Sequence, residues 1–235
     1  MSGPARGGAA VLDSTQWQAL EADSLYRFFR AGDEETLALR GVSLSVSAGE
    51  MVAVTGPSGS GKSTLLSLLA GLDEPDGGTV RVQGHRLSHR SEPVRAGLRA
   101  RMIGVLFQSG NLQPPLSVTG NIHLAQRLGD HTGRPAVPDL LAGLGLTARA
   151  AAYPGELSGG ELARAALAVA LANDPAVLLA DEPTGELDGH TETQVLDLLR
   201  GRADHGVAIL VASHSPAVAA AADRVITLTD GRVTR

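Results

Sequence analysis

Short, dense hydrophobic runs recur along the chain, and each is bounded by glycine or by polar residues. Continuous apolar runs of this length are typical of strands that are buried on both faces of a parallel sheet. The pattern predicts such strands at Met51–Thr55, Ile103–Phe107, Val177–Ala180, Ala208–Ala212 and Val225–Leu228.

Stretches with helical periodicity lie between these runs. They predict helices at Lys62–Ala70, Pro93–Arg101, Pro138–Leu144, Gly160–Ala172, Thr191–Arg200 and Pro216–Ala222. Strands that alternate with helices favour an α/β fold, in which a mainly parallel core sheet is built with right-handed crossovers.

Two further regions depart from this alternation. Ser24–Phe29 and Val42–Val46 have the short alternating pattern of an antiparallel β layer at the N-terminal side of the domain. The stretch from about 90 to 171 is mostly helical and rich in glycine and proline, which predicts a helical lobe inserted into the sheet. Residues 1–23 lack periodicity and predict a loose leader, so we expect one domain over 24–235.

The amino-acid composition and net charge of the chain argue against several classes of function. The formal net charge is −5, which argues against a nucleic-acid partner, and the absence of cysteine excludes thiolate metal sites. The apolar runs are far shorter than the roughly 20 residues that span a bilayer. Among the 20 basic residues there is a single lysine, Lys62, and the others are arginines. A position that keeps lysine in such a chain needs its slim stem and compact charge.

That lysine lies in a glycine-rich loop between a predicted strand and a predicted helix. The segment matches G-x-x-x-x-G-K-[ST], and we call it the phosphate loop: Gly56, Pro57, Ser58, Gly59, Ser60, Gly61, Lys62, Ser63 and Thr64. Its backbone N–H groups and the following helix N-terminus suit phosphate groups. Lys62 is expected to reach the β- and γ-phosphates of ATP, and Ser63 to bind Mg²⁺.

Two adjacent carboxylates follow the apolar run that ends at Ala180. Asp181 and Glu182 therefore lie at the carboxyl end of a buried strand, where ligands bind in open α/β sheets. Strand alternation points them in different directions. We expect Asp181 to hold Mg²⁺ and Glu182 to act as general base toward the attacking water.

A third motif, Leu157-Ser158-Gly159-Gly160-Glu161, precedes an alanine-rich helix. Ser158, Gly159 and Gly160 at a helix start form a second anion site, with Glu161 next to them. An L-S-G-G motif followed by a helix and an apolar strand ending in Asp-Glu resembles the signature of ABC ATPases. The resemblance extends from about Leu25 to Arg232 and implies the ABC ATPase form of the P-loop NTPase fold.

The resemblance assigns roles to further residues. Gln108 resembles the glutamine that touches Mg²⁺ or water and relays the nucleotide state to a membrane partner. Asp188 resembles a dimer-contact aspartate, and His214 the histidine that contacts the γ-phosphate. Phe29 lies where the family carries an aromatic that stacks on adenine, with Tyr26 as the alternative.

The resemblance implies a Mg²⁺-dependent ATPase that dimerises around two ATP molecules, with Ser158 and Gly160 acting in trans. It also implies an integral-membrane permease as partner, and a cytoplasmic chain peripheral to the inner face of the plasma membrane. Motifs around Gly71–Pro75, Phe107–Leu112 and Asp181–Gly185 are similar to the lipoprotein-release, macrolide-export and cell-division subgroup. The alternative is a module that controls an envelope or division partner without transport.

Some positions depart from the family pattern. Glu161-Leu162-Ala163 precedes Arg164 where glutamines are usual, and Glu186 replaces a residue that is usually uncharged. Ser215 stands where an acid commonly follows the histidine. These departures bear on turnover rate and on signalling across the dimer, but they leave the primary catalytic groups in place.

Overall fold

A computed structural model describes residues 18–31, 34–129 and 133–234. Within these ranges the central sheet has the strand order β10-β9-β3-β8-β7-β6. Its pairings are parallel except for β9 with β10, so the predicted parallel core sheet is confirmed. The strands are β3 (Met51–Thr55), β6 (Ile103–Leu106), β7 (Val177–Asp181), β8 (Ala208–Ala212), β9 (Arg224–Thr229) and β10 (Arg232–Val233).

The sheet separates two hydrophobic cores, which explains why its strands are apolar without interruption. In β3, Met51 and Ala53 belong to the core on one face, whereas Val52 and Val54 belong to the core on the other. Both residue sets are fully buried. A strand covered on both faces has no side that favours polar residues.

An antiparallel sheet with strand order β2-β1-β4-β5 packs beside the central sheet, as predicted for the N-terminal region. Its strands are β1 (Gln18–Ala31), β2 (Glu34–Ser47), β4 (Gly77–Val82) and β5 (His85–Arg86). The predicted leader is wrong for residues 18–23, because they are part of β1 and bury Leu20 and Ala22. Residues 1–17 of that leader lie outside the described residues.

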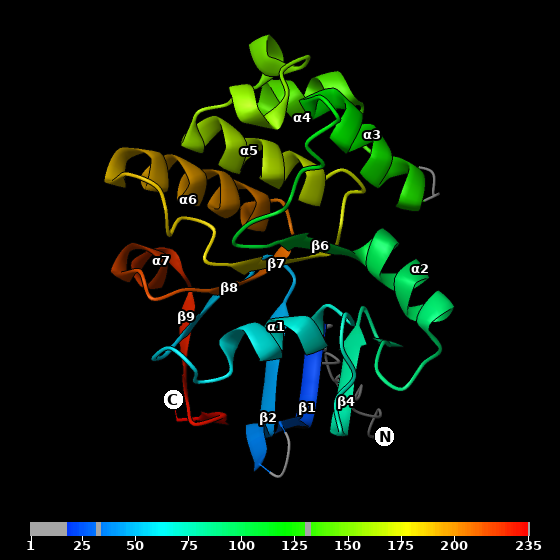
Figure 1. The fold of residues 1–235 in the computed structure, drawn as a ribbon, viewed down its shortest axis with the longest axis vertical. Helices are drawn as coiled ribbons and strands as arrows, with labels where there is room; N and C mark the ends of the chain where they lie inside the picture. The colour runs from blue at the N-terminus through cyan, green and yellow to red at the C-terminus, as the bar shows by residue number, and fades with distance from the viewer. Residues whose placement is uncertain (1–17, 32–33, 130–132, 235) are drawn as a thin grey trace, which may run out of the picture.

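Three helices form a lobe at the end of the molecule away from β1, β2 and β4 (Figure 1). They are α3 (Val118–Gly129), α4 (Val137–Gly143) and α5 (Gly159–Ala170), and all three lie between β6 and β7 in the chain. The predicted start of the lobe near residue 90 needs correction, because β6 is a strand of the central sheet and α2 (Glu92–Met102) lies beside it. Helix α3 contains Gly120, although glycine has a low helix propensity.

The remaining helices flank the central sheet and are α1 (Lys62–Leu69), α6 (Gly189–Asp204) and α7 (Pro216–Ala221). Among the described residues, no helix combines the length and hydrophobicity needed to cross a membrane.

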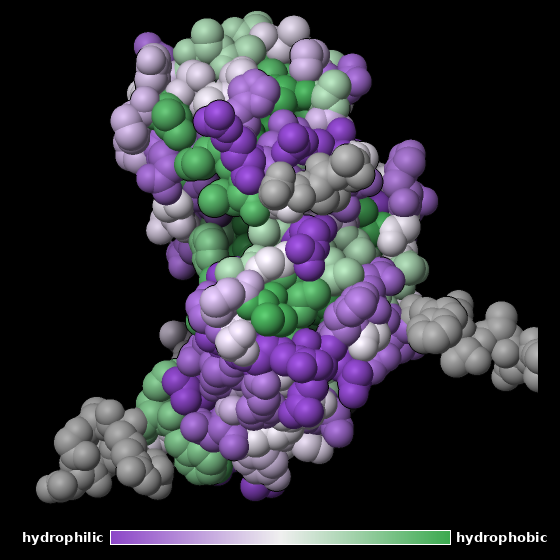
Figure 2. Space-filling model, turned by 90° about the vertical axis from the view of Figure 1, so that its right-hand side faces the viewer, coloured by the Kyte–Doolittle hydropathy of each residue, from purple (hydrophilic) through white to green (hydrophobic). Residues whose placement is uncertain are grey.

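Figure 2 shows hydrophobic residues at the surface between the lobe and the larger body, while the body below is covered mainly by hydrophilic residues. Exposed hydrophobic side chains on α2 and α3 include Val94, Leu124 and Leu128.

Candidate active site

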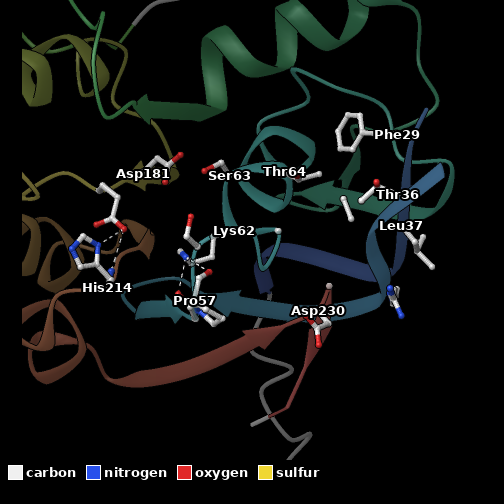
Figure 3. A pocket seen from close by; sticks show the side chains of 18 of the residues that line it. Phe29, Thr36, Leu37, Pro57, Lys62, Ser63, Thr64, Asp181, His214 and Asp230 are labelled. Carbon is white, nitrogen blue, oxygen red and sulfur yellow. Dashed lines mark hydrogen bonds and ion pairs between the residues drawn. The ribbon is translucent and has the colours of Figure 1, made fainter. Parts of the chain in front are cut away.

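An open cavity of about 830 Å³ lies at the carboxyl ends of β3, β7 and β8. It brings together most of the predicted site residues, namely Phe29, Gly56, Pro57, Ser58, Gly59, Gly61, Lys62, Ser63, Thr64, Gln108, Asp181, Glu182 and His214. Figure 3 shows Phe29 at one end of this cavity and His214 at the other, with Lys62, Ser63 and Thr64 between them. An elongated ligand with an aromatic end and a charged end fits this order.

The phosphate loop needs glycine where other elements come close. Gly56 has φ +149°, and a Cβ there would lie 2.1 Å from the carbonyl oxygen of Leu228. Gly61 has φ +103°, and its Cβ would lie 2.6 Å from the carbonyl oxygen of Ala38. Gly61 is also the N-cap of α1, so the positive end of this helix faces the cavity.

Lys62 is the first residue of α1, and its ammonium group turns back over the loop. Its Nζ donates to the carbonyl oxygens of Gly56, at 2.8 Å, and of Pro57, at 3.1 Å (Figure 3). The positive charge is thereby held above the loop, on the cavity side. Anionic groups bound in the cavity would meet both this charge and the N-terminus of α1.

The same cavity is lined by three side chains with oxygen atoms that can bind a metal ion, those of Ser63, Asp181 and Gln108. A hydroxyl, a carboxylate and an amide oxygen form a donor set that suits Mg²⁺, which is commonly held by one or two carboxylates together with substrate phosphates. No cluster of three or more His, Cys, Asp or Glu side chains suited to a metal occurs in residues 18–31, 34–129 and 133–234. The residues present therefore fit a magnesium ion that arrives with a phosphate ligand.

Glu182 and His214 form a pair at the end of the cavity. The Glu182 carboxylate accepts hydrogen bonds from His214 Nδ1 at 2.8 Å, from the His214 backbone N–H at 3.2 Å and from Ser213 Oγ at 2.7 Å. The side chain of Glu182 is 14% exposed and that of His214 is 76% exposed. Because the carboxylate accepts from Nδ1, this nitrogen carries hydrogen and Nε2 is directed away from Glu182.

The backbone places this carboxylate by an uncommon turn. Glu182 has φ +47°, in the left-handed region that non-glycine residues seldom adopt. Its N–H donates to the carbonyl oxygen of Ala212 at 2.9 Å, which ties the end of β7 to the end of β8. Conformations of this kind are concentrated at functional sites.

The two candidate aromatics lie in different places relative to the cavity. Phe29 is 43% exposed and lines the cavity, and the guanidinium carbon of Arg27 lies 4.8 Å from its ring centroid. Arg27 is itself held by Asp73. Tyr26 does not line the cavity, because its ring lies against Gly41 and Gly77.

The signature residues lie outside the cavity of their own chain. Ser158 is the N-cap of α5: its Oγ accepts from the Glu161 N–H at 3.3 Å, and its own N–H donates to Glu161 Oε2 at 2.9 Å. The Ser158 N–H, together with the Arg149 guanidinium, lowers the pKa of Glu161 to about 2. Gly160 is required locally, since a Cβ there would lie 2.6 Å from Cγ2 of Thr191.

Asp188 also lies outside the cavity and caps α6. Its Oδ1 accepts from the N–H groups of His190 and Thr191, both at 3.0 Å, and its Oδ2 from the Thr191 hydroxyl at 2.7 Å. The Thr191 N–H and then the Thr191 hydroxyl lower the pKa of Asp188. Within one chain this carboxylate has the role of a helix cap.

Several residues of the cavity wall were not predicted. Thr36, Leu37, Ala38 and Arg40 come from β2, and Asp230 and Gly231 from the turn between β9 and β10. The Asp-Gly dipeptide is a turn signal that the sequence did offer. The β2 residues carry no such signal. They reach the cavity because the Arg40 N–H donates to the carbonyl oxygen of Gly231 at 2.8 Å, which joins the two sheets.

The chain is similar in sequence to known proteins of one family. A model of the ABC transporter family matches residues 39–185. The lipoprotein-releasing system ATP-binding protein LolD 1 of Rhodospirillum rubrum is 43% identical over 222 residues, which cover 92% of this chain and 97% of that protein. The macrolide export ATP-binding/permease protein MacB of Shigella flexneri is 41% identical over 219 residues, covering 92% of this chain and 34% of MacB. The chain thus spans about a third of the length of the MacB relatives.

The solved structures that resemble this chain are also ABC transporter cassettes. The dimeric structure of the bacterial ABC transporter cassette MJ0796 superposes with a TM-score of 0.84 at 33% identity, covering 92% of this chain and 97% of that one. A dimeric post-hydrolysis state of MJ0796 bound to ADP and Pi matches equally well. The resemblance drawn from the motifs, including its lipoprotein-release and macrolide-export subgroup, is confirmed. The chain therefore belongs to the ABC transporter family, as one of its ATPase cassettes.

Proposed function

We propose that this chain binds ATP with Mg²⁺ in the cavity and hydrolyses it to ADP and phosphate as the motor subunit of a transporter. The observation that carries the proposal is that one cavity holds the phosphate loop, the carboxylate of Asp181 and the Glu182–His214 pair. A phosphate site, metal-suited oxygen donors and a candidate general base meet there. These are the parts that phosphoryl transfer to water requires.

Each of these residues has a separate role. Lys62 binds the β- and γ-phosphates, and Ser63, Asp181 and Gln108 would hold the metal ion. Bound Mg²⁺ offsets the charge that develops on the phosphate oxygens. Glu182 orients the attacking water for in-line displacement and accepts its proton on the carboxylate. His214 keeps Nδ1 on Glu182 and turns Nε2 toward the γ-phosphate, a contact that requires hydrogen on both ring nitrogens.

A second copy of the chain completes the site. Ser158, Gly159, Gly160 and Glu161 form a helix start outside their own cavity, so their anion site is available to the ATP of another protomer. Asp188 lies at the start of α6, whose Thr191 contacts Gly160. The dimers formed by the MJ0796 cassette support a homodimer of this chain that closes on ATP.

An integral-membrane permease is the proposed partner, with the chain on the cytoplasmic side of the plasma membrane. Gln108 supports a relay to this partner, because it borders both the main cavity and a neighbouring groove of about 300 Å³. The groove exposes Phe107 and Leu162, and the α5 residues that line it are Gly159, Leu162, Ala163 and Ala166. LolD is named for lipoprotein release and MacB for macrolide export, and these names favour export, or work on the outer side of the membrane, as the output of this chain. Identification of the membrane protein that co-purifies with this chain would separate transport from control of an envelope or division partner.

The direct test is hydrolysis by the purified chain. We expect ADP and phosphate to appear in equal amounts with ATP and Mg²⁺, and the rate to fall to background when EDTA removes the metal. Addition of excess Mg²⁺ should restore the rate. Turnover that is insensitive to EDTA, or no hydrolysis at any protein concentration, would contradict the proposed function.

Phe29→Ala is expected to weaken ATP binding while leaving the hydrolysis step nearly unchanged. Loss of an aromatic stack costs about 0.5–1.5 kcal/mol, which raises Kd roughly two- to twelvefold. Titration of a fluorescent ATP analogue and measurement of kcat at saturating ATP would separate the two effects. Tyr26→Ala is the matched control, since Tyr26 lies outside the cavity. A loss of affinity confined to Tyr26→Ala would show that the wrong aromatic had been chosen.

A further inference from the structure

A network of hydroxyl groups lies behind the Glu182–His214 pair and ends on a carboxylate of another helix. Ser213 Oγ donates to Glu182 Oε2 at 2.7 Å, and the Ser215 N–H donates to Ser213 Oγ at 3.1 Å. Ser215 Oγ then donates to Glu192 Oε1 at 2.7 Å. Three hydrogen bonds, linked through the covalent frame of Ser215, therefore connect Glu192 to the candidate general base.

Glu192 also binds the segment that carries Glu182. Thr184 Oγ1 donates to the same oxygen, Glu192 Oε1, at 2.9 Å. Thr184 follows β7 and is 3% exposed, whereas Ser215 follows β8 and caps α7. One carboxylate in the first turn of α6 thus holds together the two segments on which Glu182 and His214 lie.

The carboxylates of Glu182 and Glu192 only accept hydrogen bonds, so they set the direction of the hydroxyl groups in this network. Ser215 Oγ accepts from the Ala217 N–H at 3.2 Å and gives its own hydrogen to Glu192, because the Glu192 carboxylate has none to give. Ser213 is fully buried, accepts from the Ser215 N–H and gives its hydrogen to the acceptor-only Glu182 carboxylate. Loss of the Glu192 carboxylate would leave the half-buried Ser215 hydroxyl and the buried Thr184 hydroxyl without their acceptor, and a buried donor without an acceptor forces rearrangement.

We propose that Glu192 is a positioning residue for ATP hydrolysis, which fixes Ser215 and Thr184 and thereby holds Ser213 and the Glu182 carboxylate in place. This role rests on the proposed function of the cavity. Glu192 itself does not line the cavity, so it acts on the hydrolysis step rather than on ATP binding. Ser215 stands where the family commonly has an acid, and in this chain a carboxylate reaches the same place from α6.

Replacement of Glu192 by alanine should lower kcat and leave the KM for ATP nearly unchanged. We expect Glu192→Ala to lower kcat about tenfold, with KM for ATP changed less than twofold. Asp197→Ala is the matched control, because Asp197 is an exposed carboxylate on the same helix. It should leave both constants within twofold of the wild type. Thermal unfolding of each variant, monitored by circular dichroism, shows whether the protein assayed is folded.

A second substitution tests whether a carboxylate at this place is what matters. Ser215→Asp alone should lower kcat, because two carboxylates would meet at hydrogen-bond distance. In the Glu192→Ala background the same substitution should raise kcat by at least threefold, since it returns one carboxylate to the network. A change that is harmful alone and beneficial in the second background shows that the two positions are coupled, and comparison of kcat among folded variants assigns the coupling to catalysis.

The outcomes are distinguishable. Hydrolysis by the wild type, together with a Glu192→Ala kcat no lower than that of Asp197→Ala, would overturn the positioning role and leave the proposed function intact. Failure of Ser215→Asp to rescue a folded Glu192→Ala variant would overturn the role as well. Absence of hydrolysis in the wild type would overturn the proposed function, and the role of Glu192 with it.

Discussion

Lys62→Arg is expected to abolish ATP hydrolysis, with kcat at least about a hundredfold below the wild type, although the positive charge is kept. The Lys62 ammonium fits between the carbonyl oxygens of Gly56 and Pro57, at 2.8 and 3.1 Å. A planar guanidinium is broader and directs its donors as a rigid fork. It would crowd the phosphates of an ATP molecule that we propose to be bound by the backbone N–H groups of this loop.

Steady-state release of phosphate over a range of ATP concentrations would measure this effect. Arg127→Lys is a suitable control, because it also exchanges one cation for another, but at an exposed position on α3. It should leave kcat within twofold of the wild type. A Lys62→Arg variant that hydrolyses ATP like the wild type would remove the argument that this position needs a slim stem.

The central sheet and the phosphate loop could be predicted because their signals are local. A strand such as β3 is buried on both faces, so its residues are apolar whatever lies far away in the sequence. Gly56 and Gly61 have positive φ and tight neighbours, which leaves glycine as the residue that fits. Both signals consist of residue types within one short segment, so they can be recognised in the sequence, although the contacts that require these residues come from distant segments.

Helix α3 and the start of β1 were not predictable by the same reasoning. Gly120 is poorly suited to a helix in isolation, yet α3 buries Val118 and Ile122 in the core of the lobe. Tertiary packing outweighed its low helix propensity. Gln18–Asp23 has no regular apolar pattern, but this segment pairs with both β2 and β4, and its backbone gains two partners.

The finer arrangement of the site depends on contacts between distant segments. The adjacent carboxylates predicted a base at Glu182, but its φ of +47° and its bond to Ser213 arise from the meeting of β7 with β8. Glu192 gave no signal of its own, since a glutamate in the first turn of a helix is ordinarily explained by the helix dipole. Its contact with Ser215 appears only once α6 and α7 pack together.

Glu182→Gln is expected to form a stable dimer with ATP and Mg²⁺, but not with ADP, whereas the wild-type chain stays mostly monomeric. The amide keeps the shape of the side chain and removes the base, so the bound ATP persists. It also removes a negative charge near the γ-phosphate. The amide oxygen can still accept from His214 Nδ1, and Ser213 Oγ can reorient to accept from the new NH₂ group.

Each ATP in this dimer would lie between the phosphate loop of one protomer and the Ser158–Gly160 helix start of the other. The γ-phosphate then supplies contacts that ADP lacks, and a ligand shifts an assembly equilibrium only through such a difference. Size-exclusion chromatography with light scattering would measure the dimer. Adding Ser158→Arg should abolish it, because the bulky side chain occupies the trans contact. Ser91→Arg in the same Glu182→Gln background puts equal bulk at the N-cap of α2 and should leave the dimer intact. A dimer that forms equally with ADP, or that tolerates Ser158→Arg, would mean that the two motifs do not meet across ATP.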